Sequence, residues 1–458
     1  MFFSSKDGPL GDQVRATLSL ALPVIGSNLT QSLKHLTDAI MLGWYGVDEL
    51  AGGVLGTTLF SVVFIVGSGC AMATVPLAAS AEGSGLTWRV RRVIRMGIWL
   101  SLIYGVLVLL PLWNTRWLLV SLGQEELTAS LAGDYMRIAM WGMLPALGIM
   151  ALKSFFMALV RPRIVLWATL AGVVLNILAN YGLIFGNWGF PELGIKGAAI
   201  ATVVSHCFAL LIMFLYTEFK PDFRKYSLFS NFLRPDWPAF REVFRLGWPI
   251  SATLVAETGF FAITAIMMGW IDTETLAAHG ITLEIAAFVF MIYLGLANAG
   301  TVQIGRAIGL QDRAGIFLAS RAVIMLCVGA VAIVVLVMVS VPETLISAFL
   351  DTDADNADHV IAIGVSLLYV AAAFQLADAL QVVALGLLRG LSDTHLPMII
   401  ATFSYAVLGL PASYLLGFTL GGGGVGVWTG FVIGLGCAAV LLFLRYRLLL
   451  SRLELSPA

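Results

Sequence analysis

The chain has 458 residues, of which 59% are hydrophobic and only 12% are charged, and its mean hydropathy is +0.94. Soluble domains carry about 25% charged residues, so this composition excludes an ordinary globular protein. The formal net charge of −1 gives no basic surplus that would indicate nucleic acid as a partner. Apolar runs of about 20 residues or more, long enough to cross a bilayer, recur along the whole chain and predict an all-α polytopic membrane protein.

Twelve transmembrane helices are predicted from the apolar runs and the Gly, Pro and charged residues that separate them. The N-terminal run carries an acid and is too long for a signal peptide, so we count it as the first span. The first six spans are expected at about 15–43, 50–80, 95–113, 129–159, 164–187 and 195–218. The second six are expected at about 241–270, 276–305, 314–341, 359–388, 396–419 and 424–446.

The loops between these spans differ in charge. If the N-terminus is cytoplasmic, 21 of the 26 Lys and Arg residues fall in cytoplasmic segments, and only Arg116 and Lys196 fall in outside loops. The loop 351–358, DTDADNAD, lies on the outer side in this arrangement, and all of its charged residues are acidic. Basic loops are retained in the cytoplasm. We therefore expect both termini in the cytoplasm and a multi-pass protein of the inner or plasma membrane.

The chain repeats itself at a nearly constant offset. Pro23 aligns with Pro249 and the segment 41–44 (MLGW) aligns with 267–270 (MMGW), both at an offset of 226. Further pairs at slightly larger offsets are Arg161 with Arg389 and Gly197 with Gly426. Since six is an even number of helices, the halves share one orientation and form a direct, parallel repeat. We predict six-helix lobes at 1–218 and 241–458, joined by a cytoplasmic linker at 219–240.

Polar residues interrupt several of the predicted spans. An ionised acid at mid-bilayer costs about 2.5–3.5 kcal/mol on insertion scales, so each acid needs a reason. On the first span a polar stripe recurs at three- and four-residue spacing, formed by Asn28, Gln31, Lys34 or His35, and Asp38. Other spans carry Thr169, Asn176 and Asn180; Thr253, Glu257 and Thr264; Gln375, Asp378 and Gln381; and Glu284 alone.

The acids do not follow the repeat. Asp38 aligns with Thr264, Glu257 with Gln31, and Asp378 with Met150. A structural role stays open, because Lys34 or His35 is close enough along the helix to pair with Asp38. The functional interpretation is that these carboxylates bind an exchangeable proton, or bind an alkali cation together with Asn and Thr oxygens. A lipophilic organic cation would compete for the same negative charge, which is the physical basis of antiport.

Motifs of enzymes are absent from the sequence. It has no Walker A segment, no nucleophile elbow and no HExxH or Cys/His metal cluster, so we expect neither an enzyme nor a bound cofactor. The four cysteines lie singly in apolar runs and are expected to pack as small residues.

Several segments are similar to one known family. The stretch LALPVIGSNLTQSLKHLTDAIMLGWYGVDELAG resembles the first-helix region of the MATE (multidrug and toxic compound extrusion) transporters, and QLADALQVVALGLLRGLSDT at 375–394 resembles the tenth helix of the NorM-type branch. Also similar are LNILANYGLIFG, PELGIKGAAIAT and AGTVQIG. The resemblance implies a V-shaped pair of lobes in a monomer that exports small organic cations or drugs in exchange for Na⁺ or H⁺.

The resemblance also implies two cation sites. It assigns one to Asp38, Asn176, Asn180 and Thr202 in the first lobe, and another to Glu257 and Asp378 in the second, with Gln31, Glu284 and Gln375 as possible additional residues. The chain departs from the family at position 374, which is Phe rather than Tyr, at position 180, where other branches carry an acid, and at Glu284. Two alternatives remain open: a flippase for a lipid-linked or amphiphilic substrate, and a channel or membrane-embedded receptor.

Overall fold

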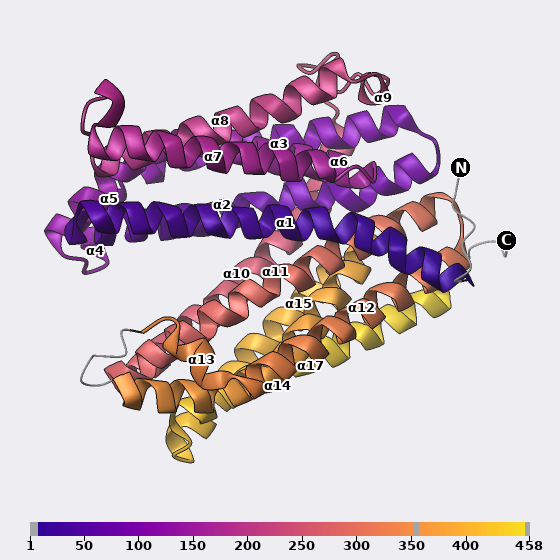
Figure 1. Ribbon diagram of the computed structural model, residues 1–458. Coiled ribbons are helices and arrows are strands. Elements are labelled where there is room, and N and C mark those ends of the chain that lie inside the picture. Colours follow the sequence, from indigo (N-terminus) through magenta and orange to yellow (C-terminus); the bar gives the residue numbers. More distant parts are fainter. Residues whose placement is uncertain (1–7, 351–356, 454–458) are drawn as a thin grey trace. The chain divides into compact units, whose positions relative to one another are not determined.

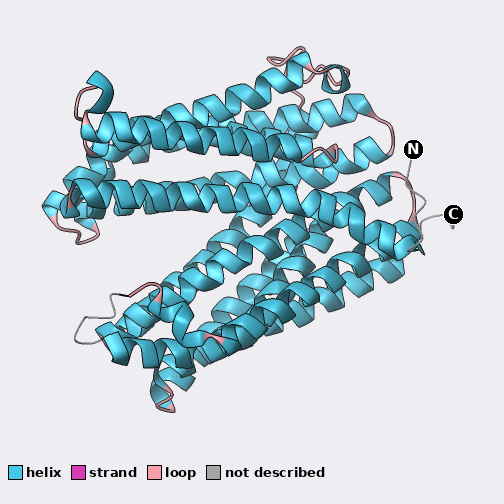
Figure 2. Cartoon of the chain, viewed as in Figure 1, coloured by secondary structure: helices cyan, strands magenta, loops and turns pink. Residues whose placement is uncertain are grey.

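The computed structural model describes residues 8–350 and 357–453, and every regular element in these ranges is a helix (Figure 1, Figure 2). Eleven helical segments of the described chain are long and apolar enough to cross a membrane. Helix α1 (Gly8–Tyr45), the first of the twelve predicted spans, is also long enough at 38 residues, although its polar side chains keep it outside that group. The prediction of an all-helical polytopic protein is confirmed. Most of the acidic loop predicted at 351–358 lies outside the described residues.

The helices form two compact units. The N unit is Gly26–Ser251, and the C unit combines the described residues up to Ile25 with those from Ala252 onward. The long helices α1 and α10 (Trp237–Ile271) therefore each contribute to both units. The remaining helices of the N unit are α2 (Val47–Gly83), α3 (Thr87–Trp113), α4 (Thr115–Ser121), α5 (Glu126–Ala139), η1 (Met140–Gly142), α6 (Met143–Ala158), α7 (Arg163–Phe185), η2 (Asn187–Gly189), α8 (Ile195–Phe219) and α9 (Pro221–Arg224).

The C unit continues with seven α-helices and two π-helical segments. These are α11 (Thr273–Gly309), α12 (Arg313–Ser340), α13 (Pro342–Ser347), α14 (Ala357–Gly390), α15 (His395–Phe403), η3 (Ser404–Gly409), α16 (Leu410–Tyr414), η4 (Leu415–Thr419) and α17 (Gly423–Arg452). The π segments flank Pro411, which lacks a backbone N–H and so breaks the regular α-helical ladder.

Small residues let the helices of each unit approach closely, as is usual in membranes. A Cβ at Gly197 would lie 2.4 Å from the carbonyl oxygen of Leu183, and a Cβ at Gly426 would lie 2.3 Å from that of Leu416. These two glycines are partners in the sequence repeat, and each lets the start of its helix rest on the backbone end of the preceding helix. The two halves of the sequence repeat therefore share this close contact between consecutive helices.

The same symmetry holds where α1 and α10 enter their units. Gly69 of α2 packs against Ser251, and Gly295 of α11 packs against Ile25; both glycines and both partners are related by the offset of 226. The Ser251 hydroxyl donates to the Val66 carbonyl at 2.6 Å. Helix α1 thus starts in the C unit and continues into the N unit, and α10 starts in the N unit and continues into the C unit.

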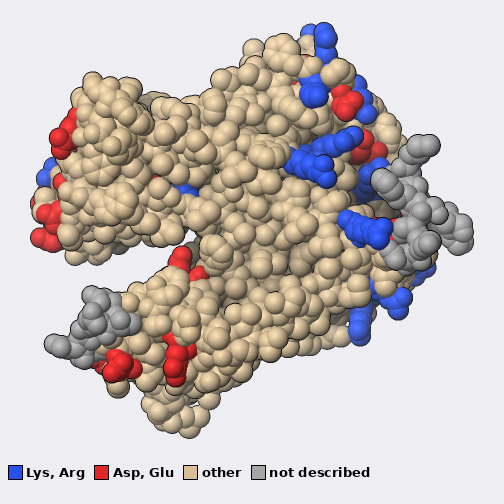
Figure 3. Space-filling model, in the orientation of Figure 1, with Lys and Arg blue, Asp and Glu red and all other residues tan. Residues whose placement is uncertain are grey.

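The linker predicted at 219–240 packs on the start of α3 within the N unit. Asp236 accepts a bidentate ion pair from Arg92, with one bond of 2.8 Å, and this guanidinium holds the pKa of Asp236 below its ordinary value. Arg95 and Trp99 donate to the carbonyl oxygens of Asn231 and Phe232, both at 3.0 Å. Figure 3 shows that most visible Lys and Arg atoms lie toward one end of the helices and most visible acids toward the other, with a few blue atoms among those acids.

Candidate functional site

The polar stripe of α1 is divided between buried and exposed positions. Asn28, Lys34 and Asp38 are buried, with 4% of Lys34 and 5% of Asp38 exposed. Gln31 and His35 are exposed instead and do not join the buried group. An α-helix places Lys34 and Asp38 one above the other at a spacing of four residues, so these two form the core of the stripe.

Asp38 is surrounded by neutral polar side chains of α7 and α8. Its Oδ1 accepts from the Asn180 amide at 2.6 Å, and its Oδ2 lies 3.5 Å from the Thr202 hydroxyl. Asn176 is one turn before Asn180 on the same face of α7, and its Oδ1 lies 3.5 Å from the Asn180 Nδ2. The structure therefore brings Asp38 together with the three residues that the family resemblance groups around it.

These residues sit in an apolar surround. Met41, Leu42, Tyr135 and Ile184 belong to the hydrophobic core that packs between α1, α5, α7 and α8. The Nδ2 of Asn176 and the Oδ1 of Asn180 are buried and have no hydrogen-bond partner among the described residues. Buried polar atoms are normally paired, so the Asn180 Oδ1 is available as an acceptor or cation ligand, and the Asn176 Nδ2 is available as a donor. Carbonyl, hydroxyl and carboxylate oxygens are ligands that a hard monovalent cation prefers.

The N unit also holds a buried lysine, Lys34, and a half-buried lysine, Lys153. The Lys34 Nζ lies 3.2 Å from the Nε2 of His206, a residue of α8 whose ring stacks on Phe60. The Lys153 Nζ donates to the Oδ1 of Asn28 at 2.8 Å. His206 was not predicted as a site residue, although it is an isolated histidine in the apolar run of the sixth span.

The C unit contains a second buried polar group. Glu257 on α10 and Asp378 on α14 are buried, with 2% of Asp378 exposed, and the two carboxylates are close enough to interact electrostatically. Gln375 and Gln381 are fully buried on the same helix as Asp378, at three-residue intervals. We call these four residues and Tyr405 the Asp378 cluster.

Most of the Asp378 cluster is not hydrogen-bonded within the described chain. One oxygen of each acid, both amide atoms of Gln375 and of Gln381, and the hydroxyl of Tyr405 have no partner there. The hydroxyls of Tyr293 and Ser404 are buried and unpaired in the same unit. So many unpaired polar atoms in one helix bundle cost stability, which indicates retention for binding rather than for folding.

Two further positions were singled out in the sequence. Glu284 is exposed on α11 and does not join the Asp378 cluster. Phe374, the departure from the family that the sequence indicates, is buried in an aromatic group with Phe261, Trp428 and Phe431 and offers no hydroxyl. Tyr405 instead supplies a phenol hydroxyl from η3, and local sequence gave no signal for it because it lies in an apolar run.

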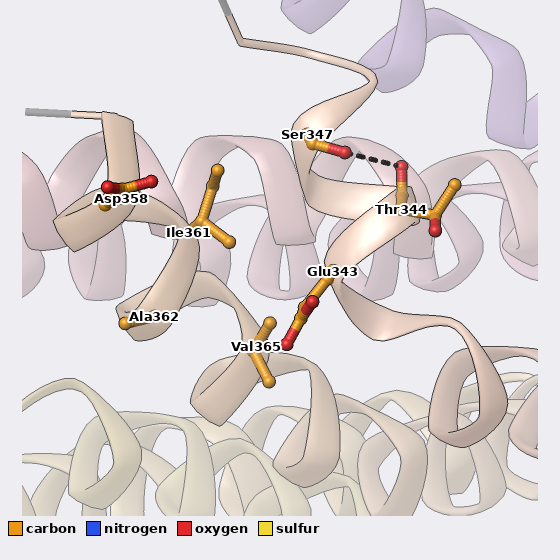
Figure 4. A pocket seen from close by; sticks show the side chains of 7 residues that line it. All are labelled: Glu343, Thr344, Ser347, Asp358, Ile361, Ala362 and Val365. Atoms are coloured by element: carbon orange, nitrogen blue, oxygen red, sulfur yellow. Dashed lines mark hydrogen bonds between the residues drawn. The ribbon is translucent and has the colours of Figure 1, made fainter. Parts of the chain in front are cut away.

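Other features lie apart from these clusters. A pocket of about 680 Å³ lies between α13 and the start of α14, where Figure 4 shows Glu343 and Asp358 among its lining side chains. It contains no residue of either cluster. Among the described residues no group of three or more His, Cys, Asp and Glu side chains could hold a metal ion.

Comparison with known proteins places the chain in a family. The MatE family model matches residues 23–182 and 249–415, one match in each half. A protein of Rhizobium meliloti (strain 1021) named "Probable multidrug resistance protein NorM" is 44% identical over 458 residues, covering 100% of this chain and 98% of its own. A protein of the same name from Agrobacterium fabrum is 42% identical, covering 98% of this chain and 96% of its own.

Solved structures agree on the fold. The outward-facing structure of a multidrug resistance MATE family transporter of the MOP superfamily has a TM-score of 0.87 at 22% identity, covering 99% of this chain and 100% of that one. A eukaryotic MATE transporter, AtDTX14, has a TM-score of 0.86 at 20% identity, covering 96% of both chains. Given the family match over more than half of the sequence and the full-length similarity to NorM proteins, the chain belongs to the MatE family of MATE transporters.

Proposed function

We propose that this protein is a secondary active antiporter that exports organic cations, including drugs, in exchange for Na⁺ or H⁺. The observation that carries the proposal is the Asp378 cluster, in which two buried carboxylates lie among polar atoms that lack partners in the described chain. Membership in the MATE family and the names of the NorM relatives support efflux of several chemically different compounds.

The chemistry of exchange follows from competition for negative charge. A buried carboxylate is stable when a proton, a metal ion or an organic cation neutralises it, and it is costly when none does. If only one of these occupies the cluster at a time, uptake of the coupling ion expels the drug. Glu257 and Asp378 supply the charge in this scheme, and Gln375 supplies neutral oxygen or amide ligands. Asp38, Asn176, Asn180 and Thr202 form the second proposed cation site, which either an ion from solution or a charged side chain can fill.

The distribution of basic residues also indicates how the protein lies in its membrane. Basic residues concentrate in the segments that we assign to the cytoplasm, including the linker on α3, and such segments are retained on that side of the membrane. We infer a monomer in the inner or plasma membrane with both termini in the cytoplasm. We propose that the two lobes of the transport cycle are residues 1–218 and 241–458, joined by the linker 219–240.

The test is transport in liposomes. The purified chain is reconstituted with a fluorescent lipophilic cation, and a Na⁺ gradient and a pH gradient are imposed separately. Movement of the dye driven by one gradient supports antiport and identifies the ion. Movement under neither gradient contradicts the proposal and favours the flippase alternative, which is then assayed with a labelled anionic amphiphile in the same vesicles. Ohmic current without substrate would favour the channel alternative.

A further inference from the structure

Lys34 is a buried cation next to Asp38 that the antiport scheme does not use. Its side chain is 4% exposed, and it interacts electrostatically with Asp38, one helical turn further along α1. Its Nζ is bonded to the Nε2 of His206 at 3.2 Å. Within the described part of the chain it forms no direct ion pair, so its ammonium is near the carboxylate without being fixed to it.

His206 provides a neutral acceptor for this ammonium. A charged Lys ammonium can only donate, so when Lys34 is ionised the Nε2 of His206 accepts through its lone pair. The ring is also held by stacking on Phe60, with ring centroids 6.3 Å apart. Lys34 has a flexible four-carbon stem and three N–H donors, so its ammonium has both the reach and the donors to move from His206 to the Asp38 carboxylate.

The net charge around Asp38 differs from that of the Asp378 cluster. The groups that interact with Asp38 are Lys34 on its own helix, Tyr135 on α5, and the neutral amide and hydroxyl groups of α7 and α8. With Asp38 and Lys34 both ionised, this cluster has no net charge. In the C unit Glu257 and Asp378 are two acids that interact with each other, and Arg389, near the end of α14, interacts with Glu257. That cluster carries one net negative charge when all three are ionised.

We propose that Lys34 is a tethered cation that takes the place of a dissociable coupling ion at Asp38, so that the exchanged ion binds at the Asp378 cluster. This inference rests on the proposed antiport function and assigns its ion to one unit. An ammonium and an alkali ion carry the same charge and are held by the same oxygen ligands, so they compete for one carboxylate. A tethered competitor is always present at high effective concentration, whereas a free ion must come from solution.

The inference predicts that removing the ammonium creates an ion site. In Lys34→Met the stem is replaced by an apolar chain of similar length, and Asp38 is left as an uncompensated buried carboxylate with Asn176, Asn180 and Thr202 around it. Such a carboxylate recruits a cation or a proton. If Lys34 only fills space, or only pairs with His206, Lys34→Met gains no ion.

Equilibrium binding on the purified full-length chain tests this. Radioactive Na⁺ binding and proton uptake on stepwise acidification are measured for the wild type, Lys34→Met, Lys34→Met/Asp38→Asn, Asp38→Asn and Asp378→Asn. Lys153→Met is the matched control, because Lys153 is a half-buried lysine within a helix of the same unit and is bonded to Asn28. Lys34→Gln is a second neutral variant should Lys34→Met fold poorly.

We expect Lys34→Met to bind one more Na⁺ or proton per chain than the wild type, and the double variant to lose that gain. Asp378→Asn should lose ion binding that the wild type has, and Lys153→Met should match the wild type. Two results overturn the inference. One is that Asp38→Asn, which keeps Lys34, binds fewer Na⁺ ions or protons than the wild type. The other is that neither folded Lys34 variant binds more of them than the wild type. Ion binding is measured without transport, so the two proposals fail separately. Absence of gradient-driven dye movement would refute the antiport function. Gradient-driven dye movement in the wild type, with no additional ion bound by the Lys34 variants, would refute only the role of Lys34.

Discussion

Replacing Tyr405 of the Asp378 cluster by Phe should stabilise the protein and slow transport. Tyr405 is 1% exposed, its ring stacks on Phe260 with centroids 5.5 Å apart, and its hydroxyl has no hydrogen-bond partner among the described residues. Phe keeps the ring and removes only the oxygen. A buried hydroxyl without a partner costs about 1–3 kcal/mol, so Tyr405→Phe should raise the free energy of unfolding by up to that amount. Transport should become slower, because the cluster loses one polar ligand.

Tyr446→Phe is the matched control in the same unit. The Tyr446 hydroxyl is also buried but is bonded to that of Ser320. Removing it deletes a hydrogen bond and should lower the free energy of unfolding by about 0.5–1.5 kcal/mol, with transport unchanged. Thermal unfolding in one detergent and dye transport in liposomes are measured for both variants. The reasoning fails if Tyr405→Phe is destabilised as much as Tyr446→Phe, since that result would mean that the Tyr405 hydroxyl has a stabilising partner.

Three other substitutions test separate parts of the structure. Asp378→Asn removes a charge that the exchange needs, so gradient-driven transport should fall about tenfold or more. This is the loss expected when about 1.4 kcal/mol of selective stabilisation disappears. Transport at the wild-type rate would contradict the role of Asp378. Asp236→Asn breaks the ion pair with Arg92 and should cost roughly 1 kcal/mol at neutral pH. Because the folded pKa of Asp236 is lowered, its stabilisation is present above about pH 4 and is lost in acid, so unfolding curves of variant and wild type should converge as the pH falls. Gly426→Ala places a Cβ 2.3 Å from a carbonyl oxygen and should destabilise by about 1–3 kcal/mol, whereas Gly329→Ala, with nothing within 4 Å, should not; equal unfolding temperatures would refute the packing argument.

The helices could be predicted because their main signal is local. A span needs a long apolar run, and the boundaries of such a run are visible in the sequence itself. The sixth span, predicted at about 195–218, is observed as α8 (Ile195–Phe219), and the seventh, predicted at about 241–270, is observed as α10 (Trp237–Ile271). The acids were also visible, because a charge within an apolar run stands out whatever its partners are.

The environment of each polar residue could not be predicted in the same way. Helical spacing places Gln31, Lys34, His35 and Asp38 on one broad face, but only packing against α7 and α8 decides which are buried. Tyr405 was missed for the opposite reason: a tyrosine in an apolar span usually packs as an aromatic ring or lies near the membrane interface. Its unpaired hydroxyl becomes evident only when η3 is placed beside α10 and α14.

The comparison of the two halves shows which features were kept in the repeat and which diverged. Gly69 and Gly295 keep equivalent packing partners, so the duplicated sequence builds the same backbone contacts twice. The polar residues do not follow this rule. Thr264, the repeat equivalent of Asp38, is fully buried and donates to the carbonyl of Phe260 at 2.8 Å, which leaves no charge there to neutralise. Gln31, the equivalent of Glu257, is exposed. Since the backbone demands no acid at these positions, each acid is specific to its own unit, and moving one to its repeat-related position should not restore transport.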